Sequence, residues 1–263
     1  MSLRDKIQQA AKRTDAATLV GAVAAVKRGD RSGFIPITGA MIWAGYSCPD
    51  AIEAVYDNIA TAWLGSGSAP EVPTGLAEAP LEDSFWEAFW EVVQGPPEGY
   101  DAYTVTVAVA ALGEKVHPDY EAIAESNARN HLGAAIALTS PIPGFTDMDA
   151  LAHCPQGSLG KSLNNMIVEN GYDPEVLDRE GIKLNAKPHS LHYLNARILQ
   201  MHDVWHLVAG YTTHSSNEIA ISAFQLAQFG HNYSGMFLAF GMALSTTSEP
   251  RGFTVLMQIV TEA

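Results

Sequence analysis

The sequence predicts an all-α protein, a single helical domain with an antiparallel helix pair able to hold a metal ion. The chain has 263 residues, of which 47% are hydrophobic and 17% charged, so it can bury a sizeable core. Helix start and stop signals recur along it, and most segments between them place apolar residues at helical spacing. Two histidines four residues apart, near the end of one predicted helix, mark the helix pair.

Residues 1–64 are expected to form the N-terminal helices. Ala16 to Lys27 is rich in Ala, Leu and Val, which is typical of a buried helix, and a second helix is predicted from about Pro49 to Trp63. Residues 65–84 then contain Gly-Ser-Gly-Ser, three prolines and several acids. This composition favours an exposed loop, and it makes the segment the best linker candidate in the chain.

The remaining segments continue the helical pattern. Phe85 to Val93 places aromatic side chains on one helical face, whereas Tyr100 to Leu112 alternates Thr and Val, which a strand would also do. We predict a helix there. Further helices are predicted for Pro118–Leu138, Ser158–Glu169, Ser190–Met201, Asn217–Gln228 and Phe253–Val260.

The charge of the chain disfavours polyanionic partners. Its formal net charge of −14 disfavours binding of nucleic acid or anionic lipid by bulk electrostatics. Cys48 and Cys154 lack the spacing of a disulfide framework or a thiolate zinc site, which favours a reducing cytoplasm. No export or organelle signal is visible, and the apolar run Met236–Leu244 is far short of the ~20 residues that span a bilayer.

The most informative stretch is His202-Asp203-Val204-Trp205-His206, followed after eleven residues by Glu218. On an α-helix, positions 202, 203 and 206 point at about 0°, 100° and 40°, an arc narrow enough for one ion. Gly210 is expected to end this helix, and Ser215-Ser216 to cap the next. Glu218 would then lie in the first turn of the second helix, and an antiparallel pair would bring it back toward the histidines.

Two simpler interpretations compete with a metal site. Nine histidines in a chain of this length produce some His-x-x-x-His pair by chance roughly one time in three. Ser215-x-x-Glu218 also fits a capping box, which needs no metal. Asp203 inside the pair and an acid at the start of the next helix together favour the metal interpretation.

A second motif, Pro155-Gln156-Gly157-Ser158-Leu159-Gly160, lies about forty residues upstream, and Arg197 lies between the two motifs. Read with His-Asp-x-x-His, eleven residues and Glu, this order resembles the ubiquinone (coenzyme Q) biosynthesis family named Coq-four. The resemblance covers roughly residues 145–245, the metal-motif core, and residues 1–115 carry no motif that matches it. The sequence departs from the family pattern at Asn217, where Gly is usual, and at Leu163, where an aromatic residue is common.

The resemblance implies an all-helical protein with a divalent ion, usually taken as zinc, beside an apolar cavity for a polyprenyl tail. It implies ubiquinone biosynthesis by removal of the C1 carboxyl of a prenylated 4-hydroxybenzoate-derived ring and its replacement by hydroxyl. The alternative is a non-catalytic polyprenyl-lipid-binding scaffold that organises the other quinone-biosynthesis enzymes. Either role implies a bacterial cytoplasmic protein at the surface of the inner membrane, with prenylated aromatic or polyprenyl lipids as partners and a homodimer as one arrangement.

The residue types leave the identity of the metal open. Imidazole and carboxylate ligands suit Zn²⁺ and also Fe²⁺ or Mn²⁺. We expect His202 and His206 as ligands, Asp203 as a ligand or as the residue that orients one, and Glu218 as a ligand or proton acceptor. Asp203 and Glu218 are thus the catalytic candidates. A zinc hydrolase is a weaker alternative, because it would use a longer Glu where this motif has Asp203.

Other side chains near the motif have both a structural and a functional interpretation. Ser222, Gln225 and Asn232 would line the polar end of a cavity, or form the solvated stripe of an amphipathic helix, which we favour. The remaining histidines nearby lack the motif's spacing and are expected in loops or in the core: His189, His192, His214 and His231. A lipid tunnel or the protein core would explain a group of large apolar residues equally well: Phe224, Phe229, Met236, Phe237, Phe240 and Met242.

Overall fold

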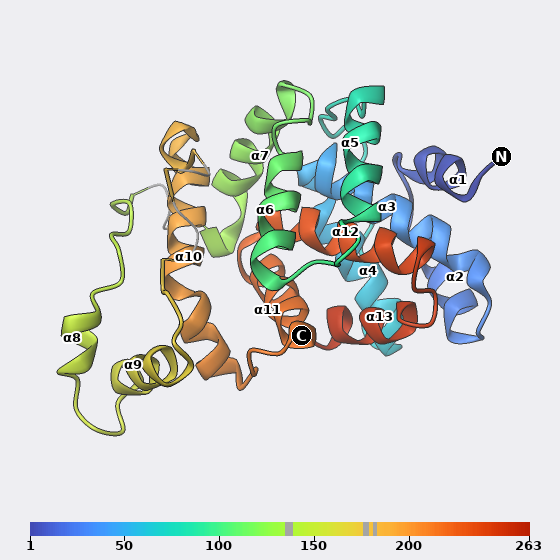
Figure 1. Cartoon of the computed structure of the whole chain (residues 1–263). Helices are drawn as coiled ribbons and strands as arrows, with labels where there is room; N and C mark the ends of the chain where they lie inside the picture. Colours follow the sequence, from blue (N-terminus) through green and yellow to red (C-terminus); the bar gives the residue numbers. More distant parts are fainter. Residues whose placement is uncertain (135–138, 176–178, 181–182) are drawn as a thin grey trace.

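The computed structural model describes residues 1–134, 139–175, 179–180 and 183–263, and over these residues the protein is all-α (Figure 1). Thirteen α-helices and no strands occur in this part of the chain. The first seven are α1 Leu3–Ala10, α2 Ala16–Lys27, α3 Phe34–Tyr46, α4 Ile52–Leu64, α5 Asp83–Gln94, α6 Ala102–Leu112 and α7 Asp119–Asn130. The others are α8 Met148–Ala152, α9 Leu159–Asn170, α10 His189–Ala209, α11 Ser215–Phe229, α12 Asn232–Thr247 and α13 Phe253–Glu262.

Local sequence signals set the ends of many of these helices. Side-chain oxygens at N-cap positions accept from backbone N–H groups that the first turn leaves unpaired, at Ser2, Asp15, Asp101, Asp147 and Ser158. Four helices end at a glycine in the left-handed region, which side chains avoid: Gly65, Gly171, Gly210 and Gly230. These N-cap residues and glycines therefore set where the helices begin and end.

The main core forms around α12, which packs against α3, α11 and α13. Helices α3 and α12 cross so closely that a Cβ on Gly45 would lie 3.0 Å from the carbonyl oxygen of Gly235. Tyr46 and Tyr56 then donate hydrogen bonds to main-chain carbonyls of α12, at Met236 and Gly235. These bonds anchor α12 to the N-terminal helices and fix the position of α11, which precedes it.

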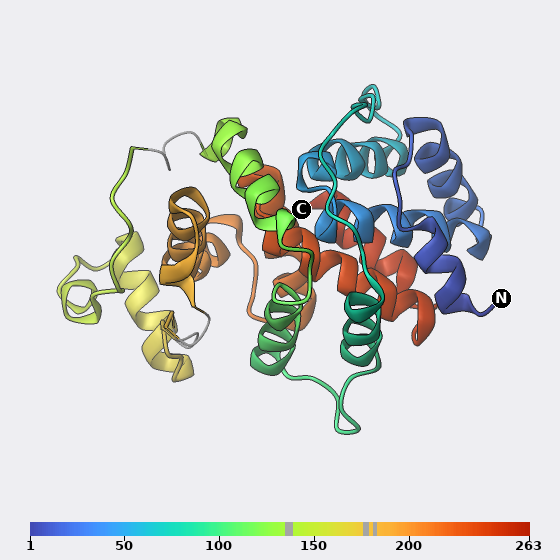
Figure 2. The ribbon, with the colours of Figure 1, turned by 90° about the horizontal axis from the view of Figure 1, so that it is seen from above.

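Helices α8, α9 and α10 lie on the side of the molecule opposite α1 and α2, as both views show (Figures 1 and 2). Helix α10 packs against α7, α9 and α11. Helix α8 buries none of its residues, whereas α9 buries Leu163, Asn164 and Ile167. The long helix α10 thus joins a thinly packed side to the main core.

The structure confirms the all-α prediction and most of the predicted helices. Tyr100–Leu112, which the Thr/Val alternation left open, is helical from Ala102. The helix predicted for Pro118–Leu138 was too long, because α7 ends at Asn130 and His131 is extended. The chain then packs so tightly on α11 that a Cβ on Gly133 would collide with the Gln228 carbonyl. Residues 135–138 of that prediction lie outside the described residues.

Within the described residues, no helix combines the length and the apolar character needed to cross a membrane. Residues 65–82 are not helical, in keeping with the predicted loop, and α5 begins at Asp83. The division into a single domain stays a prediction.

Candidate metal centre

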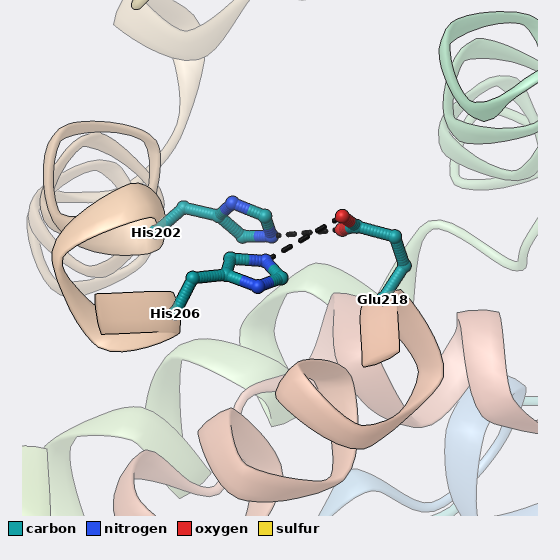
Figure 3. A group of neighbouring side chains, drawn as sticks. All are labelled: His202, His206 and Glu218. Carbon is teal, nitrogen blue, oxygen red and sulfur yellow. Dashed lines mark ion pairs between the residues drawn. The ribbon is translucent and has the colours of Figure 1, made fainter. Parts of the chain in front are cut away.

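Helix α10 carries His202, Asp203 and His206 near its C-terminal end, and it stops at Gly210, whose φ is 73°. After residues 211–214 the chain enters α11, with Glu218 in the first turn. The two imidazoles of α10 and the carboxylate of α11 point toward one another (Figure 3). The short connection therefore brings the acid of the second helix back to the histidines of the first.

His202, His206 and Glu218 form a compact set of metal-ligand atoms. Nε2 of His202 lies 3.3 Å from Oε2 of Glu218, and Nε2 of His206 lies 3.5 Å from Oε1. The imidazole rings are 4.7 Å apart between centroids. One potential ligand atom from each residue lies within 4.8 Å of the other two, so small side-chain movements would place all three around one ion.

His206 gives a separate indication that the set fits a metal ion. The residue is 1% exposed, Nδ1 makes no hydrogen bond, and Nε2 has only the long 3.5 Å contact with Glu218. Buried polar atoms are normally paired, because burial without a partner costs free energy. A cation between Nε2 and Oε1 of Glu218 would give this nitrogen a closer partner than the 3.5 Å contact does, and the donor set of two imidazoles and a carboxylate suits a divalent transition-metal ion.

Asp203 stands apart from the three converging side chains. Its Oδ1 lies 3.4 Å from Nδ1 of His202, on the far side of the ring from Glu218. A carboxylate at this nitrogen favours the tautomer with the proton on Nδ1, which leaves Nε2 free as a ligand. Of the two roles expected for Asp203, its position suits the one in which it orients a ligand.

Charge pairing between α10 and α11 is strong even without an ion. Burial opposes the charged form of His202, but hydrogen bonds to Asp203 and Glu218 and the two carboxylate charges raise its pKa to about 9. Burial also opposes the charged form of Glu218, and the hydrogen bonds and charges of His202 and His206 lower its pKa to about 2. The carboxylate is therefore ionised at neutral pH, as a metal ligand must be, whereas His202 is protonated without an ion and would release its Nε2 proton when one binds.

The competing capping-box interpretation does not match the backbone. In the structure α11 begins at Ser215, and His214 is its N-cap residue, with no side-chain hydrogen bond at the cap. Ser215 is therefore not at the position that a Ser215-x-x-Glu218 box requires. The carboxylate of Glu218 is directed at the histidines instead.

The motif Pro155–Gly160 forms the entry to α9. Gly157 has a φ of 78°, and Ser158 caps the helix by accepting from the backbone N–H of Lys161. A Cβ on Gly160 would lie 2.7 Å from Sγ of Cys154, so a larger residue would have to displace the Cys154 side chain. The motif thus has a local structural explanation.

Two expectations for the polar residues after Glu218 were wrong. Gln225 is only 4% exposed, so it does not belong to a solvated stripe, and Asn232 opens α12 instead of continuing α11. Sequence reasoning also missed a buried polar cluster. In it Ser234 lies beside both Gln225 and His231, and His231 is hydrogen-bonded to Asn195. Asn195 precedes His202 by seven residues and Gln225 follows Glu218 by seven. Because seven residues are about two helical turns, this spacing could have indicated that each pair shares a helix face.

The fold and site define an all-helical protein with a candidate metal centre of two histidines and a glutamate. Residues 106–261 match the family model described as coenzyme Q (ubiquinone) biosynthesis protein Coq4. The match covers more than half of the chain, and the chain belongs to this family. Membership links it to ubiquinone biosynthesis, as the resemblance in its motifs implied.

A curated relative supports the assignment. Over 136 residues the chain is 28% identical to the mitochondrial ubiquinone biosynthesis protein COQ4 of Coprinopsis cinerea, a match covering 51% of this chain and 46% of the relative. The chain thus spans about half the length of the curated relative. A crystal structure of a Nostoc punctiforme protein, provisionally assigned to ubiquinone biosynthesis, is 23% identical with a TM-score of 0.48, covering 68% of this chain and 81% of that one.

Proposed function

We propose that this chain acts in ubiquinone biosynthesis as a metal-dependent oxidative decarboxylase that replaces the C1 carboxyl of a prenylated 4-hydroxybenzoate-derived precursor with hydroxyl. The observation that carries the metal-dependent part is the convergence of His202, His206 and Glu218, with the buried imidazole of His206 held only by a long contact to Glu218. Family membership supports the choice of pathway, and the substrate class is part of the proposal.

The three residues would hold a divalent ion, Zn²⁺ first, with Fe²⁺ or Mn²⁺ as alternatives that share the same ligand types. When bound, such an ion supplies Lewis-acid stabilisation of a phenolate or carboxylate, and iron or manganese would add redox capacity. His202 and Glu218 are about a third exposed, so a substrate could reach this side of the site, whereas His206 is closed off from water.

The overall reaction is a two-electron oxidation of the ring. The aromatic acid and one water become the phenol, CO₂, two protons and two electrons, and dioxygen is the oxidant that accepts them, giving hydrogen peroxide. The bond from C1 to the carboxyl carbon breaks and a C1–O bond forms. The two protons end in the hydrogen peroxide, so they must pass from the acid and the water to the reduced dioxygen within the site.

The chain's own residues have defined parts in this scheme. Asp203 holds the Nδ1 proton of His202 and thereby directs the ring toward Glu218. Glu218 is ionised and accepts protons or binds the ion through one oxygen, since its two oxygens face different histidines.

Exposed apolar residues between α7 and the end of α10 favour a second candidate, a non-catalytic scaffold that binds polyprenyl lipid. Several large apolar side chains in the α7–α10 region face solvent, at 93% for Leu132, 69% for Phe145, 65% for Val168 and 67% for Val208. Such side chains suit contact with a lipid chain or a membrane surface, and either role would bring the protein to the inner membrane with other quinone-biosynthesis enzymes.

Substitution of the two acids separates these roles. Glu218→Ala and Asp203→Ala, with exposed Glu249→Ala as a control, should keep native circular dichroism while the first two lose C1 replacement, followed by mass spectrometry of the quinone intermediates. The expected loss is at least a hundredfold for Glu218→Ala and tens of fold for Asp203→Ala. Folded, metal-free variants that still carry out C1 replacement would eliminate the catalytic proposal and leave the scaffold.

A further inference from the structure

A second polar layer lies in the same helices as the candidate metal centre, two turns away from it. Asn195 precedes His202 by seven residues on α10, and Gln225 follows Glu218 by seven on α11. Seven residues are close to two helical turns, so each pair shares a helix face about 10 Å apart along the axis. Both layers therefore lie where α10 faces α11 and the start of α12.

His231 joins these helices through both of its ring nitrogens. Nε2 lies 3.2 Å from Oδ1 of Asn195 on α10, and Nδ1 lies 2.8 Å from Oγ of Ser234 on α12. Ser234 Oγ also lies 3.2 Å from Oε1 of Gln225 on α11. The layer therefore gathers side chains of three helices at one buried point, and the bond from His231 to Asn195 ties α10 to the start of α12.

The direction of the central hydrogen bond follows from its surroundings. The Asn195 amide nitrogen donates to the Leu191 carbonyl at 2.7 Å, so its oxygen faces His231 and must accept. Nε2 of His231 therefore carries the proton, and Nδ1 accepts the single hydrogen of the Ser234 hydroxyl, which then has none left to donate to Oε1 of Gln225. His231 and Ser234 are 2% and 1% exposed, and burial lowers the pKa of His231 to about 3, which keeps the ring neutral.

The His231–Asn195 hydrogen bond connects α10 to the corner between α11 and α12. Gly230 ends α11 with a φ of 59°, and His231 is the N-cap residue of α12. The hydrogen bond to Asn195 therefore attaches α10 to the corner between α11 and α12. Because a buried polar group without its partner is costly, α10 cannot slide along α11 without losing this bond.

We propose that His231 and Asn195 are a positioning pair that sets the register of α10 against α11 and so holds His202 and His206 opposite Glu218. The proposal deepens the proposed function, on which its metal readout rests, and adds two residues outside the ligand set. Breaking the pair would let the two helices shift, and the distance between the imidazoles and the carboxylate would widen.

The first test is a double-mutant cycle in the metal-free protein, with Asn195→Ala, Glu218→Gln and their combination, measured by urea unfolding. The loss of unfolding free energy caused by Glu218→Gln should be smaller in the Asn195→Ala background, because the ion pairs of His202 and His206 with Glu218 are already misaligned there. A matched cycle uses Thr38→Val, which breaks the buried 2.7 Å hydrogen bond between Thr38 and Thr246, far from α10, and should be additive. Equal losses from Glu218→Gln in all backgrounds would overturn the proposal.

The second test is Zn²⁺ affinity by competition with a chromophoric chelator. Asn195→Ala and His231→Ala should bind Zn²⁺ about tenfold more weakly, whereas Thr38→Val should stay within about twofold of the parent. Asn195→Asp keeps an acceptor for Nε2 and should restore the affinity, and it also serves if Asn195→Ala does not fold. Unchanged Zn²⁺ affinity in folded Asn195→Ala would refute the positioning role. A parent protein that binds no Zn²⁺ would refute the proposed function, and the double-mutant cycle in the metal-free protein would then decide whether the pair sets the helix register.

Discussion

Residues 1–105 and residues 139–210 contribute to this protein in opposite ways. The first region lies outside the family match, yet it supplies much of the main core, including Trp43, Tyr46, Phe85 and Phe89 at 1% exposure or less. The second region carries the Pro155–Gly160 motif and both motif histidines. Its buried residues Leu163 and Ile167 lie outside the main core, and only part of α10 joins that core, at Leu191, Tyr193 and Leu194. The part that holds most of the candidate chemistry thus contributes little of the packing that stabilises the fold.

The comparison indicates how such a site is kept in place. Glu218, on α11, is linked to the main core through α12, whereas His202 and His206 lie on α10, which reaches into the thinly packed side. The site therefore spans the boundary between the two regions. Its geometry depends on contacts that hold α10 to the core, and the predictions below examine those contacts.

The largest expected effect is a difference in lost unfolding free energy between a substitution in the main core and one in α9. Phe89 is fully buried among Tyr46, Phe85 and two tryptophans, so Phe89→Ala should lower the free energy of unfolding by about 3–5 kcal/mol. Leu163→Ala should cost about 2 kcal/mol, since its surroundings can collapse more easily. Urea unfolding monitored by circular dichroism measures both, and an equal or larger loss for Leu163→Ala would contradict the comparison.

Acid should weaken the attachment of α10 through His231. Its pKa is about 3 in the folded protein and about 6.5 when unfolded, so the unfolded chain binds the extra proton between these values. The stability that His231 contributes is thus complete above pH 6.5 and falls with pH toward 3, by about 1.4 kcal/mol per pH unit within that window.

The measurement compares the parent with His231→Gln by urea unfolding from pH 7 to pH 4. The variant lacks the titrating ring, so its stability should depend less steeply on pH. Parallel pH profiles for the two proteins would show that the ring is not held neutral.

A smaller effect is expected at the entry to α9. Ser158→Ala removes the oxygen that accepts from the Lys161 backbone N–H and should cost about 1 kcal/mol of stability. Ser162→Ala is the matched control, because that hydroxyl only donates to the Ser158 carbonyl within the helix. A change no larger than in the control would remove the structural explanation of the Pro155–Gly160 motif.

Local signals in the sequence predicted most of the fold. N-cap residues and glycines marked where helices begin and end, and the end of α10 at Gly210 is one such case. The overlong helix at Pro118–Leu138 shows the limit of this reasoning, since tertiary packing of Gly133 against Gln228 decides where the chain leaves the helix.

The candidate site was predictable only in part, for a similar reason. The spacing in His202-Asp203-x-x-His206 placed all three side chains on one helix face, but it could not assign their partners. Oδ1 of Asp203 lies beside Nδ1 of His202, away from Glu218. The His231–Asn195 contact joins residues 36 positions apart, and the seven-residue spacing from His202 could suggest Asn195 but not its partner. Long-range contacts between polar side chains require the packed structure.

The most direct test of the account is the metal content of the protein purified without chelators, measured by elemental analysis beside folded His206→Ala and Glu218→Gln. The account predicts about one divalent transition-metal ion per chain in the parent and a loss of most of it in both variants. A parent protein that is metal-free as purified and takes up no Zn²⁺, Fe²⁺ or Mn²⁺ when they are supplied would contradict it.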